Sequence, residues 1–155
     1  MTDIVDSAVR SRMMSGIRGT NTRPEIIIRK GLHRNGFRYS LHASDLPGKP
    51  DLVLRRWHAV VLVNGCFWHG HDCHLFRWPG SQKEFWKRKI TRNRARDTEV
   101  YEKLAAAGWR VLVIWECAIK GRERKPLDSV LKEASRWIRR GAAVHEIRGT
   151  ADACC

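Results

Sequence analysis

Two thiols and three imidazoles lie within residues 66–74, in the middle of the chain. A further cysteine, Cys117, ends an apolar stretch far along the sequence. Zinc takes four thiolate or imidazole ligands in a tetrahedron, so these residues predict a zinc site that joins two distant segments. Buried free cysteines in a tryptophan-rich loop are the alternative. Three histidines are in reach of the remaining position, and the spacing does not choose between them: His69, His71 and His74.

A histidine that is not needed by the zinc is free for other chemistry. His69 is flanked by Trp68 and Gly70, and an imidazole titrates near neutral pH. It is therefore a candidate general acid or base beside the zinc loop. The zinc itself would staple this loop to Cys117 and stabilise the fold by about 10 kcal/mol.

A second kind of site is indicated where Pro50-Asp51 opens a predicted strand and another strand returns beside it. Mg²⁺ takes a carboxylate and other oxygen ligands, and keeps positions for water and phosphate. Where an acid-x-Lys triplet would supply the second group, the chain has Leu62-Val63-Asn64. This offers the Val63 carbonyl and the Asn64 amide. A turn aspartate with no catalytic role is the alternative interpretation of Asp51.

Two more acids stand out, and each has a structural explanation. Glu25 follows Thr22 by three residues, which is the spacing of a helix-capping box. Asp97 lies beside the basic residues of 92–96, with which it can form ion pairs within a helix. Sequence spacing does not bring Glu25 and Asp97 together.

The elements that position these residues follow from periodicity and from turn residues. Helical patterns cover about 23–35, 83–107 and 127–140, with a short helix over 4–17. Strand patterns cover 37–41, 51–54, 58–63 and 109–115. The runs 59–63 and 111–115 are wholly apolar, which is typical of strands buried on both faces. We therefore predict an α/β fold with a mixed sheet flanked by helices.

Length and charge limit the class of protein further. The 155 residues suit one domain, with an N-terminal arm over about 1–20 and an irregular, disordered tail over about 141–155. Thirty Lys and Arg against sixteen Asp and Glu give a net charge of +14, which favours nucleic acid as partner and an anionic membrane second. A merely solvated basic surface is the alternative. The short apolar runs predict no membrane span, and the N-terminus lacks a leader, which indicates a reducing cytosol.

Several of these segments together resemble the very short patch repair endonucleases. The likeness runs from about residue 8 to 122. It rests on Pro-Gly-Lys-Pro-Asp51, Gly-Cys-Phe-Trp-His69 and Trp-Glu-Cys117, together with Glu25 and Glu84-Phe-Trp86. The resemblance implies a restriction-endonuclease-like fold with one structural Zn²⁺. It also implies a Mg²⁺-dependent enzyme that nicks one DNA strand 5′ of the thymine in a T:G mispair.

The resemblance implies a role for each site residue. Zinc would be held by Cys66, His71, Cys73 and Cys117. Magnesium would be held by Asp51 and the Val63 carbonyl. Water would be activated by His69, supported by Glu25 and Asp97. DNA would be contacted by a wedge of Phe67, Trp68 and Trp86, by Met14 from the minor groove, and by Lys89 and Asn93. Asn64 replaces the histidine of better-known members, and an amide cannot take a proton, although it can still orient water or phosphate.

The expected partner is double-stranded DNA with a T:G mismatch, bound by a monomer in the bacterial cytoplasm at the nucleoid. Other repair proteins are further candidate partners. Two alternatives stay open. One is a nuclease of the same fold that acts on other distorted or modified DNA, and the other is a zinc-stapled DNA-binding module with impaired catalysis, for which Asn64 is the only indication.

Overall fold

The computed structural model describes residues 21–150. A five-stranded sheet in the order β1-β2-β3-β4-β5 forms its centre. The strands are β1 (Ser40–Leu41), β2 (Leu52–Leu54), β3 (Ala59–Asn64), β4 (Arg110–Trp115) and β5 (Val144–Ile147). The helices are α2 (Arg23–Arg34), α3 (Lys83–Ala106) and α4 (Leu127–Arg140), with 3₁₀ turns at Arg55–Trp57 and Glu116–Ala118. The predicted mixed sheet flanked by helices is confirmed.

Helix α2 begins at a polar cap, as its sequence predicts. The Thr22 side chain accepts a hydrogen bond from the Glu25 N–H at 3.4 Å. The return bond runs from the Asn21 N–H to Glu25 Oε1 at 3.1 Å, one residue before the position that a capping box uses. Gly36, just beyond the helix, has a φ of +96°, the left-handed conformation that ends many helices. The N-terminus of α2 is therefore fixed, and Glu25 with it.

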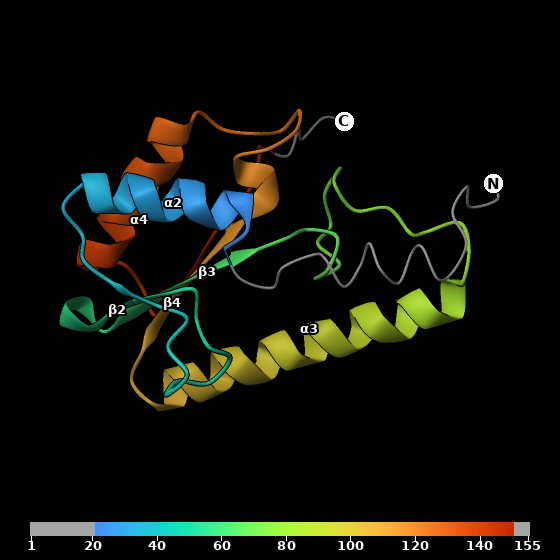
Figure 1. Cartoon of the computed structure of the whole chain (residues 1–155), viewed down its shortest axis with the longest axis horizontal. Helices are drawn as coiled ribbons and strands as arrows, with labels where there is room; N and C mark the ends of the chain where they lie inside the picture. The colour runs from blue at the N-terminus through green and yellow to red at the C-terminus, as the bar shows by residue number, and fades with distance from the viewer. Residues whose placement is uncertain (1–20, 151–155) are drawn as a thin grey trace.

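The sheet combines an antiparallel hairpin with a parallel half. Strand β2 pairs antiparallel with β3, as predicted, and β3 pairs parallel with β4. A parallel pair needs a long crossover, which α3 supplies. Helices α2 and α4 cover one face of the sheet and α3 lies along the other (Figure 1). Because both faces are covered, β3 and β4 are apolar almost throughout.

The segment after residue 141 does not match its prediction. Val144–Ile147 forms β5, which extends the sheet in parallel with β4. The disordered tail predicted over 141–155 is therefore wrong for these residues. Three of the four β5 residues are not buried, so the strand lacks the apolar alternation by which edge strands are found. It is held by pairing with β4, a long-range interaction that local sequence does not reveal.

Two other predictions need comment. The strand expected over 37–41 is reduced to Ser40–Leu41, at the exposed edge of the sheet. The predicted helix over 4–17, the arm over 1–20 and Met14 lie outside the described residues. Among residues 21–150, no helix has the length and apolar character needed to cross a membrane.

Candidate functional site

A buried carboxylate pair lies where the hairpin meets the start of α2. Asp51 directly precedes β2, and its Oδ2 accepts a hydrogen bond from the Val63 N–H at 2.8 Å. Glu25, in the first turn of α2, is 1% exposed. Single ligand atoms of Glu25, His42 and Asp51 all lie within 4.8 Å of one another. The fold thus joins two acids that are far apart in sequence, which their spacing did not predict.

The charge of Glu25 is compensated by neighbouring donors. Its Oε2 lies 2.9 Å from Arg29 Nη1 and 2.9 Å from His42 Nε2, and its Oε1 accepts the Asn21 N–H. Among residues 21–150, no basic side chain pairs with Asp51 in this way. Burial, with a smaller contribution from the nearby Glu25, raises the pKa of Asp51 to about 7, against the lowering effect of the Val63 hydrogen bond. Two adjacent carboxylates of this kind favour either a shared proton or a bound cation.

The oxygen atoms at this position suit a hard divalent ion. In extended backbone the N–H and the C=O of one residue face the same neighbouring strand. The Val63 carbonyl therefore lies on the side of β3 that faces Asp51, as does its N–H. Carboxylate and carbonyl oxygens are the ligands that Mg²⁺ prefers in proteins. The predicted magnesium ligands, Asp51 and Val63, thus fit the ion in donor chemistry, and Glu25 adds a second carboxylate.

His69 and Asp97 form a separate pair. His69 Nδ1 lies 2.5 Å from Asp97 Oδ2, so the carboxylate of α3 orients the ring. With Nδ1 carrying the proton toward Asp97, Nε2 is the nitrogen that can accept one. The His69 and Trp115 rings also form a T-shaped contact, with 6.1 Å between their centroids. The structure therefore brings together His69 and Asp97, two of the predicted catalytic residues. Asp97 contacts Nδ1 of the ring, so it does not block Nε2.

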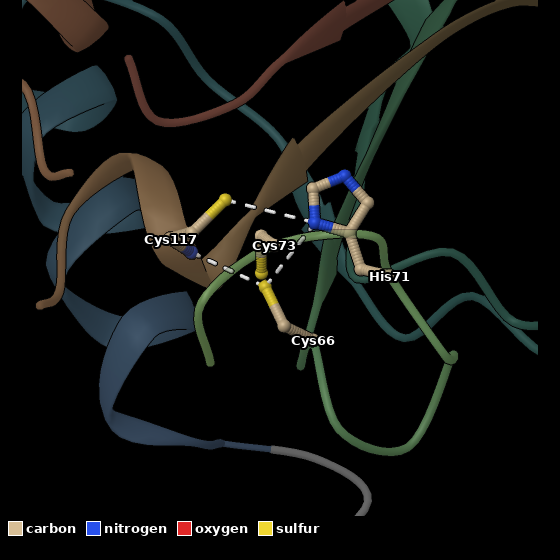
Figure 2. Close-up of side chains that lie close together, drawn as sticks. All are labelled: Cys66, His71, Cys73 and Cys117. Carbon is tan, nitrogen blue, oxygen red and sulfur yellow. Dashed lines mark hydrogen bonds between the residues drawn. The ribbon is translucent and has the colours of Figure 1, made fainter. Parts of the chain in front are cut away.

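A Cys/His cluster holds the loop on which His69 lies. Figure 2 shows Cys66, His71, Cys73 and Cys117 converging, the first three from the loop after β3 and the last from the 3₁₀ turn after β4. His71 Nδ1 is 3.6 Å from the sulfur atoms of both Cys66 and Cys117. All four ligand atoms lie within 4.8 Å of one another. Three thiols and one imidazole match the donor set of a structural zinc site.

The surroundings of this cluster favour negative charge on one of its sulfur atoms, that of Cys117. The N–H groups of Cys117 and Gly149 donate to Cys66 Sγ and Cys117 Sγ respectively, each at 3.3 Å. A hydrogen bond from the Cys66 thiol lowers the pKa of Cys117 to about 4, and the same bond, with burial, raises the pKa of Cys66. The ring of His71 stacks on Trp115 at 3.9 Å, which fixes its plane. Contacts of this kind orient the ligand atoms in the outer shell of metal sites, so the cluster could hold a metal ion.

The structure also settles which imidazole belongs to the cluster. His71 is among the converging ligands, whereas His74 Nδ1 faces Glu123 Oε2 at 3.3 Å. His69 is turned toward Asp97. Trp115 contacts both histidines, because its ring stacks on His71 and forms a T-shaped contact with His69. The Cys/His cluster and His69 are therefore connected through contacts with the same tryptophan ring.

Aromatic rings gather on the same loop and on the start of α3. Phe67, Trp68 and Trp86 lie in mutual contact, with centroid distances of 5.2 to 5.9 Å. Trp86 is 6% exposed, so it supports the other two rings from beneath. Two exposed rings continue this group and were not foreseen by the sequence analysis: Trp78, which contacts Phe76, and Phe85, which contacts Trp86. Their exposure distinguishes these two rings from core aromatics, and the sequence alone does not reveal it.

The remaining predicted residues lie on or against α3. Asn93 Nδ2 donates to the Trp68 carbonyl at 2.8 Å, so it holds the aromatic loop. Lys89 is exposed on the same helix. Asn64 is 7% exposed, and its amide donates to the Tyr101 hydroxyl at 3.1 Å. The Asn64 amide is thus occupied within the protein, by a residue that the sequence analysis did not consider.

Gly70 is required by the close approach of this loop to α3. Its φ is +59°, and a Cβ there would lie 2.6 Å from Ile90 Cγ2. We expect Gly70→Ala to lower the melting temperature and to reduce nicking, because it displaces His69. Gly36→Ala is the matched control, since it has a φ of +96° but no atom within 4 Å of the added Cβ. The left-handed conformation alone costs about 1–2 kcal/mol, so only Gly70→Ala should exceed this loss. Equal melting temperatures and normal nicking in both variants would contradict the prediction.

A carboxylate pair that suits a divalent ion and a histidine oriented by an aspartate are both typical of enzymes that hydrolyse phosphodiesters. The family model described as DNA mismatch endonuclease Vsr matches residues 2–75. The type II nicking enzyme V.XorIIP of Xanthomonas oryzae is 45% identical over 134 residues, covering 83% of this chain and 98% of that protein. The DNA mismatch endonuclease Vsr of Escherichia coli is 38% identical over 138 residues, covering 89% and 88%.

A third relative, the type II nicking enzyme V.NmeAIP of Neisseria meningitidis, is 40% identical over 135 residues and covers 86% of this chain and 96% of its own length. The chain therefore belongs to the DNA mismatch endonuclease Vsr family. The resemblance on which the sequence analysis relied is confirmed, and so is the expectation of an endonuclease.

Proposed function

We propose that this endonuclease nicks one strand of duplex DNA 5′ of the thymine in a T:G mispair, with Mg²⁺ at the carboxylate pair and Zn²⁺ at the Cys/His cluster. One observation supports it above the others. The loop after β3 carries three of the four proposed zinc ligands, the half-buried rings of Phe67 and Trp68, and His69 within residues 66–73, directly after the strand that bonds Asp51. One short segment can thus place aromatic rings against the mispair and supply the catalytic histidine.

Each metal would be held by the residues that the sequence predicted. Cys66, His71, Cys73 and Cys117 would hold zinc as a structural ion. Asp51 and the Val63 carbonyl, with Glu25 beside them, would hold magnesium. The magnesium would supply charge for the phosphate oxygens that become more negative during hydrolysis.

The chain's own residues would carry the proton. His69 Nε2 accepts a proton from the attacking water, while Asp97 holds Nδ1 and stabilises the imidazolium that forms. The backbone N–H of Val63 keeps the Asp51 carboxylate in one orientation. Asn64, bonded to Tyr101, keeps a packing role at the end of β3 and takes no proton.

Mismatch selection would come from the aromatic group. A T:G wobble pair is easier to unstack than a Watson–Crick pair, and inserted rings select for that ease. Phe67 and Trp68 would insert, supported by Trp86, and each stacked ring returns about 1–3 kcal/mol. Lys89, Asn93 and Met14 of the arm would add contacts to the duplex. The phosphate contacts would set register without carrying sequence information.

The proposal also includes the fold family, the oligomeric state and the cellular location. We infer a restriction-endonuclease-like domain that spans the chain and is stapled by zinc. It would act as a monomer on the nucleoid of a bacterial cytoplasm. The mixed sheet, with Asp51 at the open end of the hairpin and Glu25 of α2 beside it, supports the restriction-endonuclease-like fold.

A nicking assay on a mismatch panel tests the function. Duplexes that contain T:G, T:A, C:G or another mispair at one position are incubated with the enzyme and Mg²⁺, and the two strands carry different labels. We expect a single nick 5′ of the thymine in the T:G duplex. Equal cleavage of the paired duplexes would contradict mismatch direction, and cleavage of another mispair would favour the wider nuclease. Binding without cleavage would favour the impaired module.

A further inference from the structure

His42 is a residue of the carboxylate site that the sequence analysis did not consider. Strand β1 pairs Leu41 with Leu52, so the next residues along the same register are His42 and Asp51. The His42 N–H donates to the Asp51 carbonyl at 3.2 Å. The His42 side chain, 20% exposed, reaches from there to Glu25 Oε2 at 2.9 Å. One histidine thus connects the two acids, through its backbone to one and its ring to the other.

The backbone of His42 is held in an unusual conformation. Its φ is +47°, in the left-handed region that few residues other than glycine adopt. Such a conformation persists where the surroundings over-determine it, and these residues cluster at functional sites. In this conformation the His42 ring points toward Glu25, and its Nε2 lies 2.9 Å from Glu25 Oε2.

The ring is a donor in this contact and not a metal ligand. Its partner is a carboxylate that also accepts from Arg29, so His42 Nε2 carries the hydrogen. Mg²⁺ prefers oxygen ligands to imidazole nitrogen. Residues that hydrogen-bond a ligating carboxylate fix its orientation and raise the affinity of the site for its ion.

We propose that His42 is a positioning residue of the cation site, which holds the Glu25 carboxylate against Asp51. This inference rests on the proposed magnesium site. Arg29 cannot do the same alone, because its Nη1 is shared between Glu25 and Asn21 Oδ1, at 2.9 and 2.7 Å. His42 is bonded to the backbone of Asp51 instead, so it couples the position of one acid to that of the other.

Two substitutions separate positioning from a backbone role. Asparagine accepts the left-handed conformation well, but its amide ends where His42 has Nδ1 and does not reach Glu25. Glutamine is less suited to that backbone, but its amide nitrogen extends to the position of Nε2. His58, with a φ of +49° and a ring against Trp109 instead of a carboxylate, gives the control His58→Asn.

The test is Mn²⁺ binding to the zinc-loaded full-length protein without DNA, measured by electron paramagnetic resonance. We expect His42→Asn to weaken binding about 10-fold or more, while His42→Gln and His58→Asn stay within about 3-fold of the wild type. The Mg²⁺ concentration needed for half-maximal nicking should rise in His42→Asn, with kcat at saturating Mg²⁺ nearly unchanged. His42→Gln should restore the original requirement.

The outcomes distinguish this inference from the proposed function. Normal Mn²⁺ binding by His42→Asn, together with lost binding in Asp51→Ala, would overturn the role of His42 and keep the cation site. Weakened binding in both His42→Asn and His42→Gln, with melting temperatures lowered alike, would also overturn it in favour of a structural role. If Mn²⁺ binding by the wild type does not depend on Asp51, the cation site itself fails and the inference fails with it.

Discussion

Replacing Asp51 with alanine should lower the nicking rate about 10³-fold or more and leave DNA binding nearly unchanged. A bound divalent ion stabilises the transition state by several kcal/mol, and each 1.36 kcal/mol is tenfold in rate. The affinity for DNA comes mostly from basic side chains on phosphates, which this substitution does not touch. Single-turnover nicking and a binding titration on the same T:G duplex measure the two effects.

Asp45→Ala is the matched control for this experiment. Asp45 lies on the same connection before β2, but it is exposed, and within the described part of the chain its ion pair is with Arg55 at 3.2 Å. Surface pairs of this kind contribute little, so this variant should nick at the normal rate. If Asp51→Ala retains more than about a tenth of the activity, Asp51 does not hold the catalytic ion, and the carboxylate site is structural.

Asp51→Asn adds a prediction about stability. The amide oxygen can still accept the Val63 N–H, but it removes a carboxylate whose pKa is raised to about 7 by burial and by Glu25. A carboxyl with a raised pKa binds its proton more tightly in the folded state, so folding stability falls as pH rises from about 4 to 7. Without Mg²⁺, Asp51→Asn should therefore melt above the wild type at pH 8, and the difference should shrink toward pH 4. A constant difference would contradict the assigned pKa.

The fold could be predicted largely because its core elements have local causes. Thr22 and Gly36 bound α2, and the apolar run at 59–63 could only be a strand covered on both faces. The hairpin followed from the short connection at Arg55–Trp57. Strand β5 was not predicted, because most of its residues are not buried and it is ordered by pairing with β4.

The site was predicted less completely, and the reason is geometric. Cys66, Cys73 and Cys117 could be grouped because thiols are rare and zinc needs several. Glu25 and Asp51 are ordinary acids in sequence, and only the packing of α2 against the hairpin joins them. His42 could have been found only with the register of β1 and β2 in hand. The family resemblance supplied roles for Glu25 and Asp97, whereas their local spacing gave capping and ion pairing.

Replacing Cys73 with alanine should unfold the protein near physiological temperature. A structural zinc site contributes about 10 kcal/mol or more to folding, and the net stability of a domain is only about 5–15 kcal/mol. Cys73 is the best choice of the four ligands because it is partly exposed, unlike Cys66 and Cys117, so little packing is lost with its side chain. A large loss of stability would therefore report the metal and not a cavity. Zinc content per chain and thermal denaturation are the measurements.

The position of the cluster explains why its loss should extend beyond the loop. Cys117 follows β4, and Trp115 at the end of that strand stacks on His71 and contacts His69. Loss of the zinc would release the connection between the loop and β4, and with it the orientation of the candidate base. Cys155→Ala, a thiol outside the described residues, should keep one zinc per chain and the normal melting curve. A Cys73→Ala protein that is folded, zinc-free and active would show that the thiols pack without metal, and the Asp97–His69 pair would then be held by α3 alone.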